Sequence, residues 1–577
     1  MTSLSDSQNL FSALRAAFPA DLAQTAVEAT APDGSALRYS WRDLDQGSAR
    51  IANLLASLGL PEGSRIAVQV EKSVEAMLLY LATLRAGYVF LPLNTAYQRA
   101  EISYFIGNAE PAVVVCTPGN FDWVSQLAYA AGTQHVFTLG DDRSGSLLER
   151  AAQHDDAHVP ARKTADDLAA ILYTSGTTGR SKGAMLTHGN LLSNALVLKD
   201  YWGWRSDDVL IHALPIFHVH GLFVAIHAAL LGGSKMIWLP KFDPKAVIAV
   251  MPRATVFMGV PTLYVRMLAE PALNHEAARS MRLFISGSAP LLIETFRAWQ
   301  ERTGHTILER YGMSETIMLT SNPYSADARY GGQSERRGGT VGFPLPGVEL
   351  RVVDDANTPL GVCRTLGVDS ENVPQRDLFL PDSPPHSGAM GQADGKKWAA
   401  AAHSQPTIPK SDRLPAEGEI GNIQVRGPNV FKGYWRMPEK TAEEFTADGW
   451  FKTGDVGKID ERGYVSIVGR SKDLIISGGY NVYPAEVEAA INDIPGVAES
   501  AVVGVPHPDF GEVGVAVVVA KPGARLDPEA ILAQLKMQLA NYKIPKRCVI
   551  VPELPRNTMG KVQKNLLRAE HQDALSA

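Results

Sequence analysis

The sequence lacks the features that mark secreted and membrane-spanning proteins. It has only three cysteines in 577 residues, Cys116, Cys363 and Cys548, and they form no CxxC pair. This spacing excludes a disulfide framework and favours a reducing compartment. No apolar run reaches the roughly eighteen residues of a membrane-spanning helix. The N-terminus has neither a basic start with an apolar core nor an acid-free, Arg-rich character, so we expect a mature start and a cytoplasmic location.

An excess of positive charge is also missing. The net charge is -6, and 45% of the residues are hydrophobic and 20% charged, as in a globular protein. Such a chain has no general attraction to nucleic acid or to anionic membranes, so we expect neither as a partner. Any site for an anion must therefore be local.

The arrangement of apolar segments predicts an α/β protein. Strand-like "SRIAVQVE" is followed by helical "SVEAMLLYLATLRAG", and this alternation recurs along the chain. We expect a large multi-sheet N-terminal domain over 1–471 and a small mobile α+β C-terminal domain over 472–577. In the small domain, Asp527 is placed to cap a helix that begins at Pro528. Residues 355–415 are rich in Pro, Ser, Gly and Ala and are expected to be a flexible insertion.

The segment "LYTSGTTGRSKG", Leu172 to Gly183, has the composition of a phosphate-binding loop. Glycines let the backbone turn sharply and present its N–H groups, hydroxyls add donors, and Lys182 adds a positive charge. The spacing of Gly176 and Lys182 does not fit the Walker pattern. A Gly/Ser linker is the alternative, but a buried strand before the loop and a strand and helix after it favour a packed phosphate site.

Further motifs follow this loop in order: "FISGSAPL", "ERYGMSET", "GWFKTGD", "GYVSIVGRSKDLI", "GGYNVYPAEVE" and "PRNTMGK". Together they resemble the acyl-adenylate-forming superfamily, which includes acyl-CoA synthetases, luciferases and the adenylation domains of peptide synthetases. The resemblance covers nearly the whole chain apart from the insertion. Within the superfamily, the text of several segments is most similar to malonyl-CoA synthetases.

The resemblance implies a binding site for ATP. Glu315 would help to hold Mg²⁺, for which a hard oxygen ligand is suitable. Asp455 and Arg470 would bind the ribose. The remaining ATP-binding residues that the resemblance implies are Thr174, Ser175, Gly176, Thr177, Thr178, Gly179 and Lys182 around the β- and γ-phosphates, Gly287, Ser288, Ala289, Glu309, Arg310, Tyr311 and Gly312 around adenine, and Ser314.

The resemblance also implies two conformations. Lys561 matches the C-terminal lysine of the family and would be the catalytic residue of adenylation, next to the α-phosphate. Lys472 lies at the expected hinge between the domains, and rotation there would bring Gly478 and Gly479 to the path of the CoA thiol. A lysine-modifying enzyme acting on Lys561 is a further partner that the resemblance suggests.

The acyl site is read from "HALPIFHVHGLFVAI" and the start of "RLFISGSAPL". His218 and His220 share one side if the backbone there is extended, with Val219 between them. A zinc site needs more ligands than these two, so we expect His218, Val219, His220 and Met318 to line the acyl pocket. Arg282 is expected to pair with a substrate carboxylate. The alternative for Arg282 is a structural ion pair with a neighbouring acid.

These features predict a malonate–CoA ligase that uses ATP, Mg²⁺ and CoA: it forms malonyl-AMP with release of pyrophosphate and then converts malonyl-AMP to malonyl-CoA. Methylmalonate is a further substrate to consider, and a ligase for another small, medium-chain or aryl acid is the alternative enzyme. A carrier-protein-dependent adenylation module and a catalytically inactive nucleotide-binding protein are alternatives of other classes.

Overall fold

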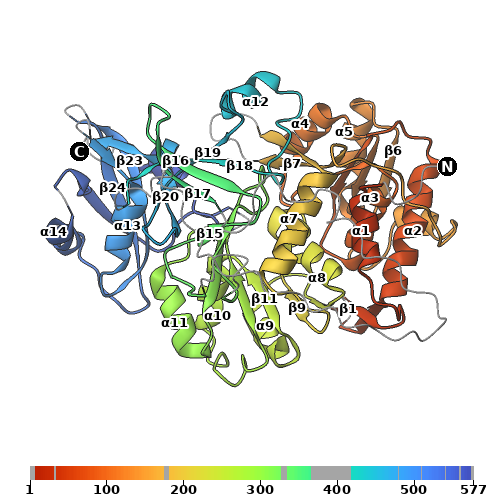
Figure 1. Ribbon diagram of the computed structural model, residues 1–577, viewed down its shortest axis with the longest axis horizontal. Helices are drawn as coiled ribbons and strands as arrows, with labels where there is room; N and C mark the ends of the chain where they lie inside the picture. The colour runs from red at the N-terminus through yellow and green to blue at the C-terminus, as the bar shows by residue number, and fades with distance from the viewer. Residues whose placement is uncertain are drawn as a thin grey trace, which may run out of the picture.

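A computed structural model of the chain describes residues 7–31, 34–174, 181–326, 334–364, 418–477, 480–507, 510–539, 541–557 and 560–572. The described strands form three sheets in a large N-terminal domain and one in a small C-terminal domain. Figure 1 shows the first elements of the chain, in red and orange, at one end of the molecule and the C-terminal sheet, in blue, at the other. The predicted fold class is confirmed: the protein is α/β, with a large multi-sheet domain and a small C-terminal one.

The first sheet has six strands in the order β6-β5-β3-β4-β7-β8. It is parallel except for the antiparallel β7–β8 pair, as repeated strand–helix–strand connections require. The strands are Arg65–Gln69 (β3), Val89–Pro92 (β4), Val113–Cys116 (β5), His135–Thr138 (β6), Leu168–Thr174 (β7) and Lys182–Thr187 (β8). Its helices are Trp41–Ser57 (α2), Val74–Arg85 (α3), Arg99–Ala109 (α4), Phe121–Ala130 (α5) and Ser146–Ala151 (α6), with a 3₁₀ turn at Pro118–Asn120 (η2).

The second sheet has nine strands in the order β15-β14-β13-β12-β11-β9-β10-β1-β2. Its six central strands, from β13 to β1, are parallel, so their carboxyl ends meet at one edge. Ligands of such sheets bind at that edge. The strands are Thr25–Thr30 (β1), Ala36–Ser40 (β2), Val209–His212 (β9), Lys235–Trp238 (β10), Val256–Gly259 (β11), Leu283–Ser286 (β12), Ile307–Tyr311 (β13), Thr320–Ser321 (β14) and Phe343–Pro344 (β15).

One continuous apolar core joins these two sheets, and Leu79, Leu192 and Phe223 are among its buried side chains. It includes residues of three helical segments that follow the phosphate-loop hairpin in sequence, among them a π-helix. The helical segments of this part are Leu10–Ala16 (α1), His188–Tyr201 (α7), the π-helix His220–Ile226 (η3), His227–Gly232 (α8), Pro244–Val250 (α9), Met251–Arg253 (η4), Pro261–Leu268 (α10) and Ile293–Thr303 (α11).

The third sheet is antiparallel, in the order β17-β16-β18-β19-β20. Its first strand corrects the start of the expected insertion 355–415: Pro359–Arg364 pairs with Glu349–Val353, because backbone pairing with a buried strand orders this segment. Residues 365–415 lie outside the described residues. The elements are Glu349–Val353 (β16), Pro359–Arg364 (β17), Gly421–Arg426 (β18), Phe451–Ile459 (β19), Val465–Arg470 (β20) and the helix Pro438–Glu444 (α12).

The C-terminal domain has the order β22-β21-β24-β23, with β25 beside β24, and its own two apolar clusters. As predicted, Asp527 caps the helix that begins at Pro528, and its side chain accepts a hydrogen bond from the Glu529 amide. The elements are Ser471–Asp473 (η6), Ile475–Ser477 (β21), Tyr480–Val482 (β22), Pro484–Asn492 (α13), Val497–His507 (β23), Gly511–Ala520 (β24), Pro528–Gln538 (α14), Asn541–Lys543 (η7), Arg547–Val551 (β25) and Lys564–His571 (α15).

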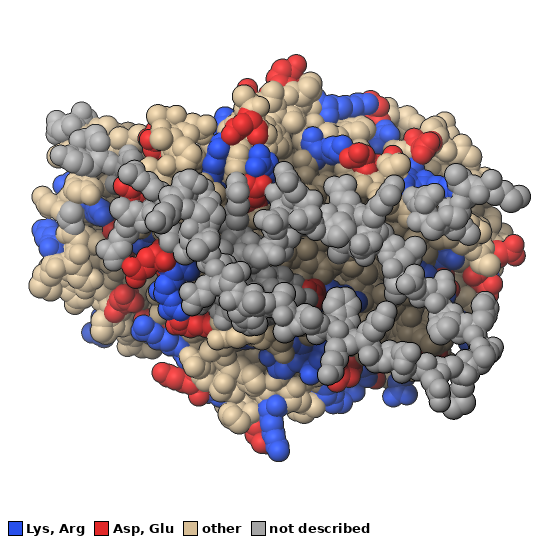
Figure 2. All heavy atoms as spheres, in the orientation of Figure 1, with Lys and Arg blue, Asp and Glu red and all other residues tan. Residues whose placement is uncertain are grey.

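The surface agrees with the small net charge. Figure 2 shows acidic and basic side chains interspersed over the visible part of one face, without a single large area of one sign. In the part of the chain that the structure describes, no helix is both long and apolar enough to cross a membrane. All three cysteines are free thiols, and Cys116 and Cys548 are buried.

Candidate active site

The β7–β8 hairpin places the two ends of the predicted phosphate loop side by side. Thr174 ends β7 and is paired with Lys182, the first residue of β8, and the Thr174 hydroxyl lies 3.4 Å from the Lys182 carbonyl oxygen. Five other predicted phosphate-binding residues, Ser175, Gly176, Thr177, Thr178 and Gly179, lie outside the described residues. The two ends of the loop are therefore held in the six-stranded sheet by the paired strands β7 and β8.

Lys182 lies next to the acidic residue predicted to hold Mg²⁺. Its Nζ is 4.3 Å from the ring centroid of Tyr434 and 3.3 Å from Glu444 Oε1. The Tyr434 hydroxyl donates a 3.0 Å hydrogen bond to Glu315 Oε1. Burial raises the pKa of Glu315, while Tyr434, Arg470 and Lys182 favour its ionised form. A buried carboxylate beside a cation suits a site for a metal ion and polyphosphate.

The predicted ribose-binding pair is formed by two adjacent strands of the third sheet. Asp455 on β19 is paired with Arg470 on β20, and Arg470 Nε lies 2.7 Å from Asp455 Oδ1. The hydroxyl of Tyr311, at the carboxyl end of β13, donates a hydrogen bond to the other Asp455 oxygen. Burial raises the pKa of Asp455, and Arg470 and Tyr311 oppose this effect. The aspartate thus joins the nine-stranded sheet to the third sheet at the candidate site.

The predicted adenine segments also meet at this edge. Gly287, Ser288 and Ala289 follow the carboxyl end of β12, next to β13 with Glu309 and Tyr311. Ser288 has a positive φ of 70°, an unusual conformation for a residue other than glycine. Gly312 leads out of β13 where a Cβ atom would lie 1.9 Å from the Ile317 carbonyl oxygen, and Ser314 follows it directly before Glu315.

Glu309 is buried, and only one of its oxygens has a described partner. Its Oε1 accepts a 3.0 Å hydrogen bond from the Leu291 amide, and Oε2 has no partner among the described residues. Burial raises the pKa of Glu309 to about 8. The carboxyl group is therefore protonated in the folded protein near neutral pH.

Lys561 reaches this site from the C-terminal domain. Its side chain keeps contact with solvent, yet its ammonium is surrounded closely enough that burial lowers the pKa of Lys561, an effect that Arg470 reinforces and Asp455 opposes. Lys561 in turn contributes to lowering the pKa of His218. Its turn rests on α10, where a Cβ atom on Gly560 would lie 2.9 Å from Thr262 Oγ1. The ammonium is therefore near enough to Arg470, Asp455 and His218 to interact with each of them electrostatically.

The most unusual group in the site is the guanidinium of Arg310. Arg310 is 2% exposed, and none of its three side-chain nitrogens has a hydrogen-bond partner among the described residues. Burial lowers the pKa of Arg310 to about 9. A Cβ atom on Gly287 would lie 2.5 Å from Arg310 Nη1, so glycine is needed at that position for the guanidinium to fit. Side chains alternate along a strand, so Arg310 faces away from the side of Glu309 and Tyr311.

Both ring nitrogens of His220 are also buried without described partners, and His220 lies close to Arg310. Burial lowers the pKa of His218 to about 4, and Arg310 contributes to this shift and to the one at His220. The Ser286 hydroxyl lacks a described partner too, but Ser286 is paired with Glu309 and therefore faces the other side of the sheet from Arg310. Buried polar groups are almost always hydrogen-bonded in folded proteins. Arg310 and His220, called the acyl-site cluster below, therefore suit an anionic ligand.

The structure contradicts the assignment of Arg282 to the acyl pocket. Arg282 precedes β12, at the opposite end of the strand from Ser286, and its guanidinium forms a bidentate ion pair with Asp208, in which Nε lies 2.7 Å from Oδ1. Asp208 is fully buried and is held further by the Thr255 hydroxyl at 2.8 Å. Arg282 thus forms the structural ion pair, because Asp208, just before β9 and two strands away from β12 in the sheet, already occupies its donors.

The backbone at the two histidines is not extended. His220 begins the π-helix η3, so the alternation of an extended chain does not place His218 and His220 together. His220 nevertheless lies in the acyl-site cluster, and its amide lies 3.4 Å from His218 Nδ1. Val219 and Met318 are both 2% exposed and belong to the same apolar core. Among the described residues, no group of three or more potential metal ligands is found.

Several residues of the site carry no role in the sequence analysis. Ser286 was part of the quoted motif "FISGSAPL", and Tyr434 stands in "GPNVFKGYWRM", but neither residue type indicates a partner by itself. Of the predicted hinge and thiol-path residues, Lys472 lies in the turn η6 between β20 and β21. Gly478 and Gly479 lie outside the described residues.

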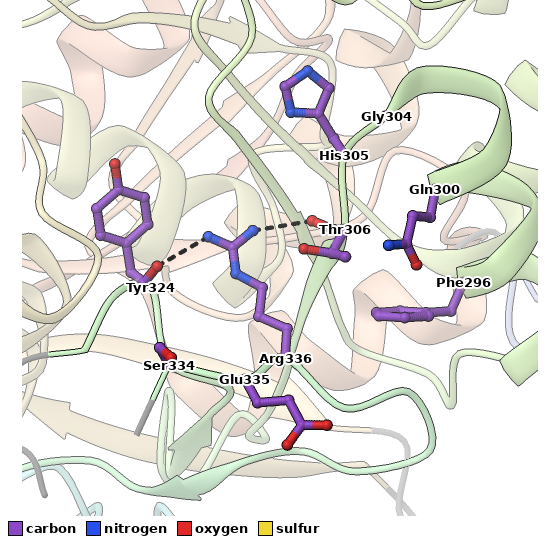
Figure 3. A pocket seen from close by; sticks show the side chains of 9 residues that line it. All are labelled: Phe296, Gln300, Gly304, His305, Thr306, Tyr324, Ser334, Glu335 and Arg336. Atoms are coloured by element: carbon purple, nitrogen blue, oxygen red, sulfur yellow. Dashed lines mark hydrogen bonds between the residues drawn. The ribbon is translucent and has the colours of Figure 1, made fainter. Parts of the chain in front are cut away.

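A separate cavity of 520 Å³ lies at the other end of β13. Arg336 reaches into it and donates hydrogen bonds to the carbonyl oxygens of Thr306 and Tyr324, at 3.0 and 3.2 Å (Figure 3). Its lining residues are Phe296, Gln300, Gly304, His305, Thr306, Tyr324, Ser334, Glu335 and Arg336. Because Thr306 precedes β13 whereas Arg310 and Tyr311 end it, this cavity is distinct from the candidate active site.

Comparison with known proteins agrees with this geometry. The sequence profile of AMP-binding enzymes matches residues 18–365, and that of the AMP-binding enzyme C-terminal domain matches residues 486–561. The chain is 31% identical to the malonate–CoA ligase of Arabidopsis thaliana over 98% of this chain and 89% of the relative. It is 35% identical to a feruloyl-CoA synthase of an Amycolatopsis species over 93% of this chain and 94% of the relative. The crystal structure of ATP-bound MatB from Rhodopseudomonas palustris superimposes with a TM-score of 0.84 at 50% identity, covering 98% of this chain and 99% of that one.

The protonated state of Glu309 makes a prediction about stability and pH. The folded pKa of about 8 lies above the ordinary value of 4.5. Between these values the folded state holds a proton that the unfolded state has released, so stability falls as pH rises from 4.5 towards 8. Glu309→Gln removes this dependence, and we expect its thermal midpoint to rise relative to the wild type between pH 5 and pH 8. The limit is about 1.4 kcal/mol per pH unit.

Parallel melting curves of wild type, Glu309→Gln and Glu301→Gln at several pH values test this expectation. Glu301 is an exposed glutamate on α11 and serves as the control for loss of one acid. A difference between Glu309→Gln and wild type that stays constant over this pH range would show that Glu309 is ionised in the folded protein.

Proposed function

The chain belongs to the family of AMP-binding enzymes, and we propose that it is a malonate–CoA ligase, which activates malonate with ATP and transfers the malonyl group to CoA. Its family and its relatives are those of AMP-forming ligases that join an acid to a thiol. The proposal concerns the acid, the residues that bind it and the order of the two half-reactions.

The unpaired guanidinium of Arg310 is the observation that supports a dicarboxylate. A charge buried without a counter-ion is unfavourable, and a carboxylate of the ligand would relieve this by accepting two N–H bonds from the guanidinium. Malonate has two carboxylates separated by one carbon. One would react with ATP while the other pairs with Arg310 and accepts from an N–H of His220. Arg310 thereby takes the role that the sequence suggested for Arg282, rather than a role at adenine.

The relatives allow two kinds of acid, and Arg310 favours one of them. The Arabidopsis relative is named for malonate, and the Amycolatopsis relative for feruloyl-CoA, the thioester of an aryl acid. A buried cation next to the neutral ring of an aryl acid would remain unpaired, so the site suits malonate better. Methylmalonate adds one methyl group, and Val219 and Met318 are the apolar side chains that we propose to limit space there.

Adenylation requires stabilisation of charge on the α-phosphate. A malonate oxygen attacks the α-phosphorus, the bond to the bridging oxygen of pyrophosphate breaks, and pyrophosphate leaves. We propose that Lys561 stabilises the developing charge, because its ammonium interacts electrostatically with both Asp455, on the proposed nucleotide side, and His218, on the proposed acid side. Thr174, the loop 175–179 and Lys182 would hold the β- and γ-phosphates, and Asp455 and Arg470 the ribose. Gly287 to Ala289, Glu309 and Tyr311 to Gly312, with Ser314, would enclose the adenine side.

The residues around Glu315 fit a magnesium ion bound with ATP. Glu315 offers a carboxylate within reach of the phosphate loop, and the buried Thr316 hydroxyl has no described partner. Mg²⁺ in such sites takes one or two carboxylates together with phosphate oxygens and water. When bound, it would neutralise phosphate charge.

Thioester formation requires a different arrangement of the C-terminal domain. The thiol of CoA attacks the malonyl carbonyl, the bond to AMP breaks, and AMP leaves with the electron pair. We propose that rotation about Lys472 withdraws Lys561 and moves Gly478 and Gly479 to the thiol path. The unpaired cysteines are consistent with a reducing compartment, and a cytoplasmic location and modification of Lys561 remain parts of this proposal.

The assignment of Arg310 is tested by substituting Arg310 and Arg282 separately. Arg310→Met keeps the volume of the side chain and removes its charge, so we expect kcat/KM for malonate to fall by about a hundredfold, as for loss of a charge-assisted hydrogen bond. Propionate should be affected much less. The measurement is malonate-dependent and propionate-dependent release of pyrophosphate.

Arg282→Met is the matched control. It breaks the ion pair with Asp208, so it should lower the thermal midpoint while leaving the ratio of malonate to propionate activity unchanged. A wild type that prefers aryl acids, or an Arg282→Met variant that loses malonate selectively, would refute the proposed acid site.

The role of Lys561 is tested by separating the two half-reactions. We expect Lys561→Ala to lose malonyl-AMP formation by about a hundredfold or more, the effect of deleting a donor to a transition-state oxyanion. The variant should still convert supplied malonyl-AMP and CoA to thioester. Single-turnover assays of each step give the result, with exposed Lys458→Ala as the control. Equal loss of both steps would contradict two separate arrangements of the C-terminal domain.

A further inference from the structure

Lys72, Trp238 and His212 form a chain of contacts that leads to the residue after His220 of the acyl-site cluster. Strands β9 and β10 end at His212 and Trp238, at the same edge of the nine-stranded sheet as Ser286 and Tyr311. The two rings stack with centroids 4.5 Å apart and an interplanar angle of 16°. Lys72 Nζ lies 4.6 Å from the Trp238 ring centroid. None of these three residues has a role in the proposed mechanism.

Lys72 ties the ends of the two strands together. Its Nζ donates hydrogen bonds to the carbonyl oxygens of His212 and Leu239, at 2.8 and 2.7 Å. The His212 carbonyl also accepts from the Leu239 amide at 3.1 Å, and Leu239 directly follows β10, so Lys72 adds hydrogen bonds to both chains where the two strands end. The face of the Trp238 ring provides a third favourable contact for the ammonium. Lys72 thus holds both the backbone of His212 and the ring on which His212 is stacked.

His212 in turn contacts the π-helix η3. Its Nε2 lies 3.0 Å from the Gly221 carbonyl oxygen, which is only an acceptor, so the ring proton is on Nε2. Burial lowers the pKa of His212 well below its usual range, and Lys72 adds to this shift, so the ring is neutral with Nδ1 unprotonated. Gly221 follows His220 in sequence. The hydrogen bond therefore fixes the peptide next to the histidine of the acyl-site cluster.

The position of Gly221 is constrained from the other side as well. A Cβ atom there would lie 2.1 Å from the Pro215 carbonyl oxygen and 3.1 Å from Leu214 Cβ. The first turn of η3 is therefore held between the loop that follows β9 and the His212 ring. π-Helical turns are rare and are frequently found at functional sites. Such a turn needs outside contacts to keep one conformation.

We propose that Lys72, Trp238 and His212 are positioning residues that fix the first turn of η3, and thereby set the position of His220 against Arg310 and the preference for the acid. They act through His220 and do not touch the substrate. This inference rests on the proposed function for the identity of the acid, but the positioning itself does not depend on which acid is used.

The test uses two substitutions that divide the contacts of His212. His212→Phe keeps an aromatic ring on Trp238 and removes the N–H that donates to Gly221, whereas His212→Gln keeps an amide N–H near the position of Nε2 and removes the ring. We expect His212→Phe to raise KM for malonate about tenfold or more, as for a buried carbonyl left unpaired. KM for ATP should stay within about twofold, because ATP is bound by other elements. His212→Gln should recover most of the malonate affinity.

His227→Phe is the matched control, since it removes a buried histidine from the next turn without touching Gly221. His227 Nε2 pairs with the Tyr80 hydroxyl at 2.7 Å. This variant should lower the thermal midpoint and leave KM for malonate unchanged. Lys72→Met, which removes the ammonium and keeps the stem, should change KM for malonate in the same direction as His212→Phe.

Hydrogen exchange of the peptide 218–227 gives a readout that does not depend on activity. It should exchange faster in His212→Phe and Lys72→Met than in wild type or His212→Gln. Unchanged exchange and unchanged KM for malonate in His212→Phe would overturn the proposal, as would an equal rise of KM for malonate and ATP. If the wild type prefers another acid, the proposed function fails, and the positioning role is then judged by exchange and by KM for that acid.

Discussion

The acyl site depends on one constraint, a buried guanidinium that has no acceptor within the described protein. Side chains alternate along β13. Glu309 and Tyr311 therefore face the side proposed for the nucleotide, and Arg310 faces the opposite side. Gly287 leaves the space that the guanidinium occupies, and burial favours the neutral forms of the titratable side chains that interact with it, His218, His220 and Tyr264. The folded chain thus carries an unfavourable charge that an anionic substrate neutralises. In the proposed function, selectivity arises because an uncharged substrate group would not neutralise the buried charge of Arg310.

The remaining parts of the site are assembled from elements that are distant in sequence. The phosphate loop belongs to the six-stranded sheet, Arg310 and Ser286 to the nine-stranded sheet, Asp455 and Arg470 to the antiparallel sheet, and Lys561 to the C-terminal domain. The sheets share one apolar core or are joined by buried contacts such as that between Tyr311 and Asp455, which keeps their edges in register. Lys561 rests on α10 through a turn around Gly560, a smaller contact. In the proposed mechanism, this difference would let the C-terminal domain move while the proposed acid and nucleotide sites stay fixed.

The sequence predicts the fold class, and it singles out Asp455 and Arg470, which the structure pairs, because these follow from local patterns and from resemblance. It does not predict which arginine serves the acid. Arg282 and Arg310 stand at the start and the end of neighbouring parallel strands, and only the fold shows that Asp208, 74 residues before Arg282, is its partner. The π-helix at His220 escapes prediction for a related reason: its conformation depends on contacts of Gly221 with Pro215 and His212 rather than on apolar periodicity. Likewise, the composition of the 355–415 segment hides the strand Pro359–Arg364, whose pairing partner precedes it.

The central claim is that a second negative charge on the substrate is recognised by Arg310. Malonamate, the monoamide of malonate, has nearly the same shape and a reactive carboxylate but lacks that charge. The direct measurement is the ratio of kcat/KM for malonate to that for malonamate in the wild-type protein, from ATP-dependent pyrophosphate release. The account predicts a preference for malonate of about a hundredfold, since a charged acceptor for a buried guanidinium is worth roughly 3 kcal/mol. Equal kcat/KM for the two acids would show that the site does not recognise the second carboxylate.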